Sequence, residues 1–235
     1  MGQNRSSAVM QQRIEPHDSL DDFPTPSWGT RALIAQLQRR FLPVGTALEP
    51  CCNRGYMARP LREHFSKVWA SDIHDYGWSG MDERADFLLT GNTAPFPIDW
   101  AFFNPPFMLA QEFIEKALGF VRVGCAALVR TSFVEGQDRY KQLFRDCPPT
   151  MMFQFSERLI LTKGIVRDPN EMYWDPEAKD PKTGHKGCWK KPSSATSYIW
   201  LVWVPGMERQ PFDWIPPCRR QLEKPDDYPA VAVAA

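Results

Sequence analysis

The segment from residue 99 to 107, DWAFFNPPF, places a polar side chain directly behind a strongly hydrophobic run. Trp100–Phe103 reads as a buried strand, and it stops at Asn104, Pro105 and Pro106. An exocyclic amino nitrogen is a poor nucleophile, because its lone pair is delocalised into the ring. The side-chain oxygen of Asn104 and the backbone carbonyl of Pro105 could accept its two hydrogens and compensate charge during its attack. The prolines would hold these two acceptors in place.

Phe107 adds an aromatic ring directly after this pair of prolines. A flat ring offers a face on which an extruded base could stack. The tetrapeptide Asn104–Phe107 therefore suits group transfer to an amino group carried by a planar ring. A plain turn that ends the strand is the alternative.

Three further segments that read as strands end at or beside a carboxylate, at Glu49, Asp72 and Asp86. Asp72 stands where an acid accepts hydrogen bonds from ribose hydroxyls, and Ile73 after it suits packing on an adenine ring. Asp86, beside Phe87, could accept from an adenine amino group. Three carboxylates would repel a pyrophosphate and attract a cation, which favours S-adenosylmethionine, with its sulfonium and ammonium, over NAD. Solvated acids at strand ends are the alternative.

The turn after Glu49, with the sequence PCCNRG, is similar to a nucleotide-binding turn. Gly55 can supply a backbone conformation or a close ligand approach that a side chain would prevent, and Asn53 enters the left-handed region readily. The turn lacks the three glycines of a dinucleotide fingerprint and the lysine of a phosphate-binding loop. An ordinary strand-to-helix turn also fits this stretch.

Strand-like and helix-like patterns alternate between residues 30 and 204. Helices are expected at 30–41, 56–65, 108–118 and 138–144, and strands at 46–49, 68–72, 85–88, 98–103, 125–131, 151–155 and 198–204. This alternation predicts an α/β fold in which helices cover both faces of a parallel sheet. Ligands bind beyond the carboxyl ends of the strands in such sheets, where Glu49, Asp72 and Asn104 stand.

Composition says little about which nucleic acid, membrane or metal the protein could bind. The formal net charge is zero, so binding of DNA by overall charge is not predicted, although a local basic groove remains compatible. We find neither a run of 18 apolar residues nor a secretion leader, and we expect a cytoplasmic protein that does not enter a membrane. The six cysteines have no C-x-x-C spacing and no histidine at ligand spacing, so no metal site is predicted.

The order of these motifs resembles the class I S-adenosylmethionine-dependent methyltransferases, within the amino-directed group that carries Asn/Asp-Pro-Pro-aromatic. The likeness is strongest to small DNA adenine-N6 methyltransferases of the phage and prophage type, and it covers residues 21–204. It implies a Rossmann-like, mostly parallel sheet of seven strands. It places one methyltransferase domain at 19–204, with an insertion at about 163–197. Residues 1–18 are polar and aperiodic, so we expect a flexible stretch there, and the repeated prolines of residues 205–235 predict an extended tail.

The resemblance also implies roles for individual residues. The segment 21–34 is similar to the Pro-Thr-Pro segment of these enzymes, in which Thr25 would help to hold the methionine end of the cofactor. Residues 48–55 resemble the first motif, which includes Glu49, Cys51 and Gly55. By the same likeness Asp72 and Ile73 would bind the ribose and adenine, Asp86 and Phe87 the adenine edge, and Asn104, Pro105, Pro106 and Phe107 would be catalytic. The family often has glycine at the position of Asn53, and Cys51 and Cys52 replace commoner small residues.

Two later stretches are candidates for contact with the substrate. Arg130 at the carboxyl end of the strand predicted at 125–131, and Ser132 and Gln137 after it, could line the cleft. The insertion interleaves cations with aromatic rings, namely Lys182, His185, Lys186, Lys190, Lys191, Tyr173, Trp174 and Trp189. Cations and rings suit phosphate contact and base stacking, whereas a solvated lysine-rich loop is the alternative.

We therefore expect a DNA substrate, either double-stranded with a flipped adenine or single-stranded, and a monomer or weak dimer. A methyltransferase acting on an RNA base or on a protein glutamine has the same motifs. An inactive methyltransferase fold that binds nucleic acid is a third possibility.

Overall fold

The computed structural model describes residues 21–180 and 183–229, and its centre is an eight-stranded sheet. The strand order is β10-β6-β9-β5-β4-β1-β2-β3, in which β9 is antiparallel to both neighbours and the other pairings are parallel. The strands are β1 Thr46–Glu49, β2 Lys67–Asp72, β3 Glu83–Arg84, β4 Trp100–Phe103, β5 Gly124–Arg130, β6 Met151–Phe155, β9 Tyr198–Trp203 and β10 Asp213–Ile215. The predicted α/β fold with a mostly parallel sheet is confirmed, with eight strands in place of seven. The stretch predicted to be flexible at 1–18 lies outside the described residues.

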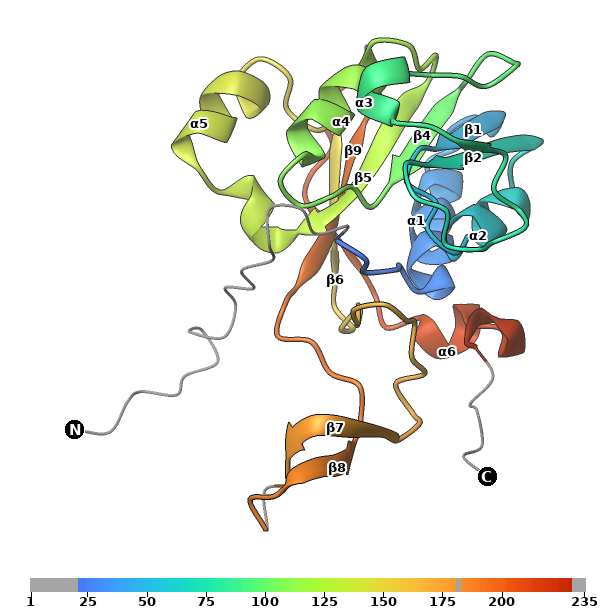
Figure 1. The fold of residues 1–235 in the computed structure, drawn as a ribbon. Helices are drawn as coiled ribbons and strands as arrows, with labels where there is room; N and C mark the ends of the chain where they lie inside the picture. The colour runs from blue at the N-terminus through green and yellow to red at the C-terminus, as the bar shows by residue number, and fades with distance from the viewer. Residues whose placement is uncertain (1–20, 181–182, 230–235) are drawn as a thin grey trace.

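Helices cover both faces of this sheet, as predicted (Figure 1). The described helices are α1 Ser27–Arg39, α2 Ala58–Arg62, α3 Phe87–Thr90, α4 Ala110–Leu118, α5 Gln137–Arg139 and α6 Arg219–Leu222, together with short 3-10 turns at Thr131–Val134 and Pro225–Asp227 and a π turn at Tyr140–Phe144. Alternation along β4 separates two cores, because successive side chains of a strand point to opposite faces. Trp100 and Phe102 pack with α1 and α2, whereas Ala101 and Phe103 pack with α4.

Three predictions of secondary structure are wrong, and the third concerns the insertion. Residues 85–88 were expected to form a strand, but Phe87 begins helix α3, because the Asp86 side chain accepts hydrogen bonds from the backbone N–H groups of Leu88 and Leu89 and so caps the helix. The chain after Pro205 was expected to be an extended tail, but it returns to the sheet. Its segment Asp213–Ile215 pairs with β6 as an edge strand, and α6 follows.

The insertion contains a β-hairpin that projects away from the sheet (Figure 1). Its strands are β7 Tyr173–Lys179 and β8 Lys186–Lys190, which pair antiparallel in a stretch that we expected to be irregular. Trp174 and Trp189 face each other across the two strands, with ring centroids 6.0 Å apart, and both are more than half exposed. The hairpin is therefore a small sheet with an aromatic pair on its surface.

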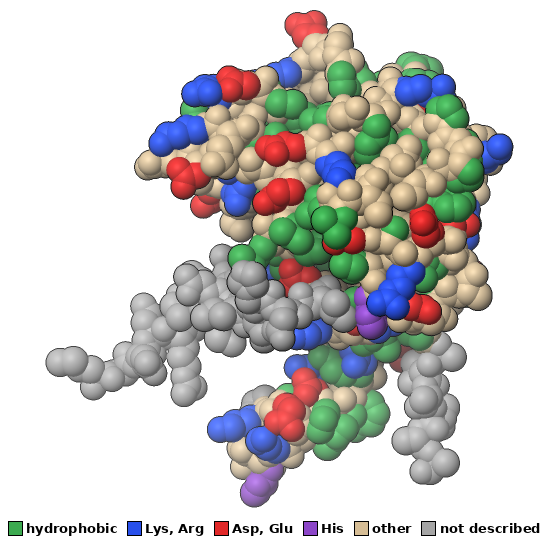
Figure 2. Space-filling view, turned by 45° about the horizontal axis from the view of Figure 1, so that its top comes forward, with side chains coloured by type: hydrophobic (Ala, Val, Ile, Leu, Met, Phe, Trp, Pro, Cys, Tyr) green, Lys and Arg blue, Asp and Glu red, His purple; other side chains and the backbone are tan. Residues whose placement is uncertain are grey.

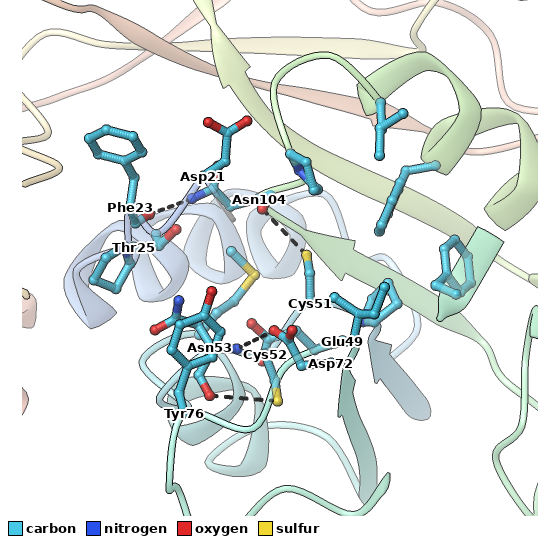
Figure 3. A pocket seen from close by; sticks show the side chains of 18 of the residues that line it. Asp21, Phe23, Thr25, Glu49, Cys51, Cys52, Asn53, Asp72, Tyr76 and Asn104 are labelled. Carbon is cyan, nitrogen blue, oxygen red and sulfur yellow. Dashed lines mark hydrogen bonds between the residues drawn. The ribbon is translucent and has the colours of Figure 1, made fainter. Parts of the chain in front are cut away.

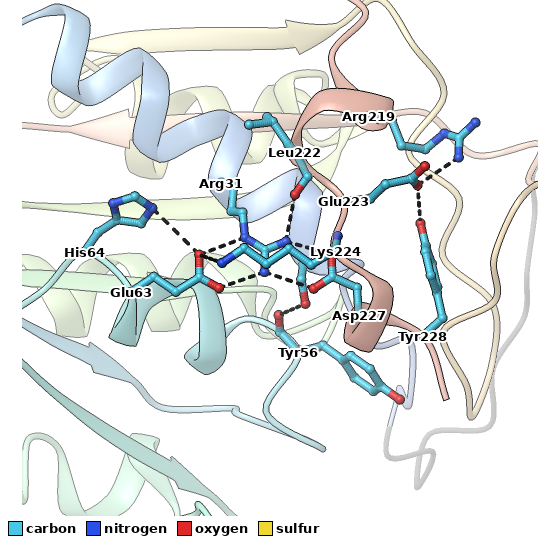
Figure 4. A network of polar contacts seen from close by, with 11 residues as sticks. Arg31, Tyr56, Glu63, His64, Arg219, Leu222, Glu223, Lys224, Asp227 and Tyr228 are labelled. Carbon is cyan, nitrogen blue, oxygen red and sulfur yellow. Dashed lines mark hydrogen bonds and ion pairs between the residues drawn. The ribbon is translucent and has the colours of Figure 1, made fainter. Parts of the chain in front are cut away.

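A polar network fastens the C-terminal segment to α1 and α2 (Figure 4). The buried guanidinium of Arg31 donates to both carboxylate oxygens of Glu63, at 2.9 and 2.8 Å, and to both of Asp227, at 2.6 and 2.9 Å. Burial acts to lower the pKa of Arg31, but the hydrogen bonds to Glu63 and Asp227 outweigh it and raise the pKa. The hydrogen bond from Arg31 lowers the pKa of Glu63 to about 2.

We expect Asp227→Ala to destabilise the protein, because it removes one carboxylate from a buried arginine. Losing one partner of a buried ion pair costs about 3–5 kcal/mol, and the remaining Glu63 places our expectation at about 3 kcal/mol. Urea unfolding measures the change. Asp226→Ala is the matched control, since Asp226 is the exposed neighbour, and equal effects of the two substitutions would contradict a stabilising role for the network.

Among the described residues, no helix is both long enough and apolar enough to cross a membrane.

Candidate active site

A pocket of 260 Å³ opens at the carboxyl ends of β1, β2 and β4 (Figure 3). It brings together eight of the nine residues predicted to bind the cofactor, namely Thr25, Glu49, Cys51, Asp72, Ile73, Asp86, Phe87 and Asn104. They come from segments far apart in the sequence, and the parallel register of β1 with β2 and β4 sets their strand ends side by side. The position predicted from the topology of the sheet is therefore the position of the pocket.

Gly55 is the predicted cofactor residue that lies outside the lining of this pocket. Its φ is +77°, and a Cβ atom at this position would lie 2.3 Å from Cε2 of Trp78. The glycine therefore makes room for an indole ring. Asn53 adopts φ +50°, the left-handed conformation expected for it, and its N–H donates to the Asp72 carboxylate at 2.8 Å.

Of the described residues, those that line the pocket carry four carboxylates, from Asp21, Glu49, Asp72 and Asp86, and include no lysine or arginine. Each Asp72 oxygen accepts one backbone N–H, Oδ2 from Asn53 and Oδ1 from His74, which orients the carboxylate. Burial raises the pKa of Asp72. This concentration of acids gives the pocket an environment that attracts a cation.

Glu49 is the most deeply buried of these acids, with 2% of its surface exposed. Its Oε2 has no hydrogen-bond partner among the described groups. Burial, followed by the repulsion from Asp72, raises the pKa of Glu49 well above its ordinary value of 4.5. An unpartnered carboxyl oxygen in an acidic pocket is suited to receive a cationic hydrogen-bond donor from a ligand.

Glu49→Gln should stabilise the ligand-free protein at neutral pH. The folded state holds the Glu49 proton more tightly than the unfolded chain does, so the free energy of unfolding falls as pH rises from 4.5 towards the raised folded pKa. Glutamine cannot ionise, so the variant should lose this part of the slope and match the wild type most closely below pH 4.5. Urea unfolding across pH 4–8 measures both proteins. The exposed Glu112→Gln is the control, and an unchanged slope in Glu49→Gln would contradict a raised pKa of the buried Glu49 carboxyl.

The segment before α1 supplies site residues that our reading of the sequence missed. Asp21 and Phe23 line the pocket, and Asp21 Oδ2 accepts the N–H of Phe107 at 2.8 Å. Asp22 is paired with Arg54 at 2.8 Å. Thr25 is buried, and its hydroxyl has no hydrogen-bond partner among the described residues. The pair of acids before the Pro-Thr-Pro segment was the available signal. Other missed lining residues are Tyr56, Met57, Tyr76, Leu109 and Phe113.

The orientation of the Asn104 amide follows from one hydrogen bond. Its Nδ2 donates to the carbonyl oxygen of Phe23 at 2.8 Å. A carbonyl can only accept, so the amide nitrogen faces Phe23 and Oδ1 is the acceptor that remains. Neither Asn104 Oδ1 nor the carbonyl of Pro105 receives a hydrogen bond from any residue that the structure describes. Both acceptors required by the predicted chemistry are therefore available.

The tetrapeptide separates the pocket from a second cavity of 170 Å³. Asn104 and Pro106 line the pocket, whereas Pro105 and Phe107 line the second cavity. The predicted substrate residues Arg130 and Ser132 also line this second cavity. The Arg130 guanidinium lies over the Phe107 ring, 3.7 Å from its centroid, and the Phe23 ring lies 5.5 Å away.

The three predicted substrate lysines do not line either of these cavities, because they belong to the hairpin region. Lys186 pairs with Glu177 at 2.7 Å and Lys190 pairs with Asp175, whereas Lys191 forms no ion pair with a described residue. Figure 2 shows the resulting surface, on which acidic, basic and hydrophobic side chains lie close together on the projecting hairpin. The described parts of the chain hold no group of three or more His, Cys, Asp or Glu side chains that could bind a metal ion.

Comparison with known proteins identifies the fold of the chain. No family model and no curated protein matches the chain. A structure described as a class I S-adenosylmethionine-dependent methyltransferase from Listeria monocytogenes matches with a TM-score of 0.52 and 11% identity, over 83% of this chain and 66% of that chain. The chain has the class I methyltransferase fold. A structure described as an RNA methyltransferase from Pyrococcus horikoshii matches with a TM-score of 0.50 and 11% identity, over 84% of this chain and 94% of that chain.

Proposed function

We propose that the pocket binds S-adenosylmethionine and that the chain transfers its methyl group to an exocyclic amino group, N6 of adenine in DNA. The observation that carries the proposal concerns the described residues. An acidic pocket without lysine or arginine in its lining adjoins a tetrapeptide whose acceptors, Asn104 Oδ1 and the Pro105 carbonyl, receive no hydrogen bond. S-adenosylmethionine supplies an electrophilic methyl group on a cationic sulfur.

The residues of the pocket fit this cofactor. Glu49 Oε2 and the Thr25 hydroxyl are buried without partners, and they suit the ammonium and carboxylate of its methionine end. Asp72 suits the ribose hydroxyls, and Ile73 with Phe87 suits the faces of the adenine. Asp86 caps α3 through Oδ1, so its other oxygen is the one that suits the adenine amino group.

The acceptor amino group would enter from the side of the tetrapeptide. Asn104 Oδ1 and the carbonyl of Pro105 would accept its two hydrogens and hold its lone pair towards the methyl group. They would stabilise the positive charge that develops on nitrogen in the transition state. The hydrogen bond from Asn104 Nδ2 to the Phe23 carbonyl fixes the orientation of the amide, so Oδ1 is already oriented before the substrate binds.

The choice of DNA as the substrate rests on aromatic rings at the tetrapeptide and on the projecting hairpin. Phe107 suits stacking of an extruded base, and the exposed pair Trp174 and Trp189 suits stacking of further bases. A glutamine side chain could also lie against Phe107, whereas the further aromatic faces of Trp174 and Trp189 suit a strand that carries several bases. These groups favour a nucleic acid over a protein substrate.

Labelled S-adenosylmethionine tests the proposal. The purified protein is incubated with it and with DNA, RNA or protein, and methylated DNA is digested to nucleosides for mass spectrometry. We expect N6-methyladenine in DNA. Label in RNA or in protein glutamine would keep the chemistry and reject the DNA substrate. If calorimetry detects cofactor binding but no methyl group is transferred to any substrate, the alternative of an inactive methyltransferase fold that binds nucleic acid would remain.

Lys191→Ala should lower DNA affinity and reduce the slope of log affinity against log salt by about one. Lys191 has no acidic partner among the described residues, so its charge is available for a phosphate. The double substitution Lys186→Ala with Glu177→Ala is the control, because it removes an ion pair without changing the net charge. Fluorescence anisotropy over a range of salt measures both. If Lys191→Ala leaves the slope of log affinity against log salt unchanged, Lys191 does not contact a DNA phosphate and belongs to a solvated surface.

A further inference from the structure

The cavity behind the tetrapeptide, lined by Pro105, Phe107, Arg130, Ser132 and Arg139 among others, has a charge opposite to that of the cofactor pocket. Its lining, as far as the structure describes the chain, contains two guanidinium groups and one hydroxyl and includes no carboxylate. The pocket on the other side of the tetrapeptide is lined by four acids and no base. The backbone of the tetrapeptide thus separates a site for a cation from a site for an anion.

Among the described residues, the two arginines of this cavity have no acidic partner. Arg31, Arg54 and Arg219 each pair with a carboxylate. Within the described chain, Arg130 forms no ion pair, and its Nε is buried with no hydrogen-bond partner. A buried donor that lacks an acceptor is unfavourable in the free protein, and a ligand acceptor would relieve it.

Arg139 is held at the cavity by neutral groups alone. Its Nη1 donates to the carbonyl oxygens of Phe133 and Glu135, at 2.8 and 2.7 Å, and its guanidinium lies over the Phe133 ring. Burial lowers the pKa of Arg139, and no carboxylate offsets that effect. Nη2 and Nε have no hydrogen-bond partner among the described residues and remain as donors.

We propose that this cavity is the subsite for a phosphate of the nucleotide whose base is methylated, with Arg130, Arg139 and Ser132 as its donors. The proposal rests on the proposed function and extends it. A guanidinium binds the oxygens of a phosphate with two parallel hydrogen bonds, and the hydroxyl adds a third donor. The cavity adjoins Phe107, so a phosphate here would lie beside a base stacked on that ring.

Arg130 also affects how a base could stack on Phe107. Its guanidinium covers one face of the Phe107 ring at 3.7 Å, where an incoming base would stack. Base stacking on that face therefore requires Arg130 to rotate away, and a phosphate offers the acceptor that Arg130 lacks. The base of the nucleotide thus takes the place of the Arg130 guanidinium on the Phe107 ring, and the phosphate of the same nucleotide binds that guanidinium.

Deoxyadenosine 3′,5′-bisphosphate and deoxyadenosine test the subsite in titrations followed by the arginine Nε–Hε resonances in NMR. We expect the bisphosphate to shift the resonances of Arg130 and Arg139 and to bind about tenfold more tightly than the nucleoside, the equivalent of one charge-assisted hydrogen bond. Arg139→Ala and Ser132→Ala should reduce this preference. Arg130→Ala should abolish it and bind deoxyadenosine at least as tightly as the wild type, because the ring is uncovered.

Arg145→Ala is the control, since Arg145 is exposed and paired with Asp146. Equal affinity of the wild type for the two ligands, or an unshifted Arg130 resonance, would overturn the subsite. Inorganic phosphate or a glutamate-containing peptide that binds as tightly as the bisphosphate would also overturn it, as a general anion site or a site for protein carboxylates. These outcomes are independent of the proposed function, which fails only if cofactor binding or methyl transfer to DNA is absent.

Discussion

Asn104→Ala lowers the turnover of DNA methylation by about 10²–10³-fold, as expected for the loss of one preorganised charge-stabilising group. The substitution removes the Oδ1 acceptor and also the Nδ2 bond to the Phe23 carbonyl, which fixes the direction of the amide. Pro105, Pro106 and the four acids of the pocket remain. We therefore expect the variant to fold and to bind S-adenosylmethionine with the affinity of the wild type, which single-turnover assays and calorimetry measure separately.

Asn104→Asp separates the two roles of this amide. The aspartate keeps an acceptor for the target amino group, but it places a carboxylate oxygen against the Phe23 carbonyl in place of the Nδ2 donor. We expect turnover between that of the wild type and that of Asn104→Ala. Full activity of Asn104→Ala would mean that the tetrapeptide is a turn that ends β4, and the proposed chemistry would be wrong.

Asp72→Ala weakens the binding of S-adenosylmethionine by about 100-fold, because the ribose hydroxyls lose a buried charged acceptor worth about 1.5–3 kcal/mol. Asp72 also accepts the N–H groups of Asn53 and His74, so the substitution loosens the turn after β1 and the loop after β2. Calorimetry with the cofactor measures the affinity. Asp75→Ala is the matched control in the same loop, because the exposed Asp75 accepts only the N–H of Gly77 and does not line the pocket.

A cofactor analogue that lacks the ribose 2′-hydroxyl distinguishes recognition from a structural effect. The wild type should bind S-adenosylmethionine more tightly than its 2′-deoxy analogue, and Asp72→Ala should lose that difference. If the variant is weakened equally for both ligands and keeps the difference, Asp72 supports the loops but does not contact the ribose.

The prediction from sequence was most successful where a local pattern determines which residues are brought together. Strand periodicity and the alternation of strands with helices predicted a mostly parallel sheet. Parallel strands present their carboxyl ends at one edge, so Glu49, Asp72 and Asn104 were expected to meet, and they line one pocket. The prediction failed at residues 85–88, because the Asp86 side chain caps the N–H groups of Leu88 and Leu89, and so short a segment with three apolar residues does not distinguish a strand from a helical turn.

The tertiary structure alone decided which groups remain available for a ligand. Lys186 and Lys190 read as free cations in the sequence, but pairing of β7 with β8 sets Glu177 and Asp175 beside them. Gly55 reads as a glycine for ligand approach, but the loop after β2 brings Trp78 against it.

The contacts around the tetrapeptide have the same origin. Phe23 lies 81 residues before Asn104 and orients its amide, and Arg130 comes from β5 to cover Phe107. By itself the sequence determined the fold class and the strand ends that form the site, because both follow from short-range periodicity. The orientation of the Asn104 amide and the two cavities of opposite charge depend on contacts between distant segments, which only the folded chain brings together.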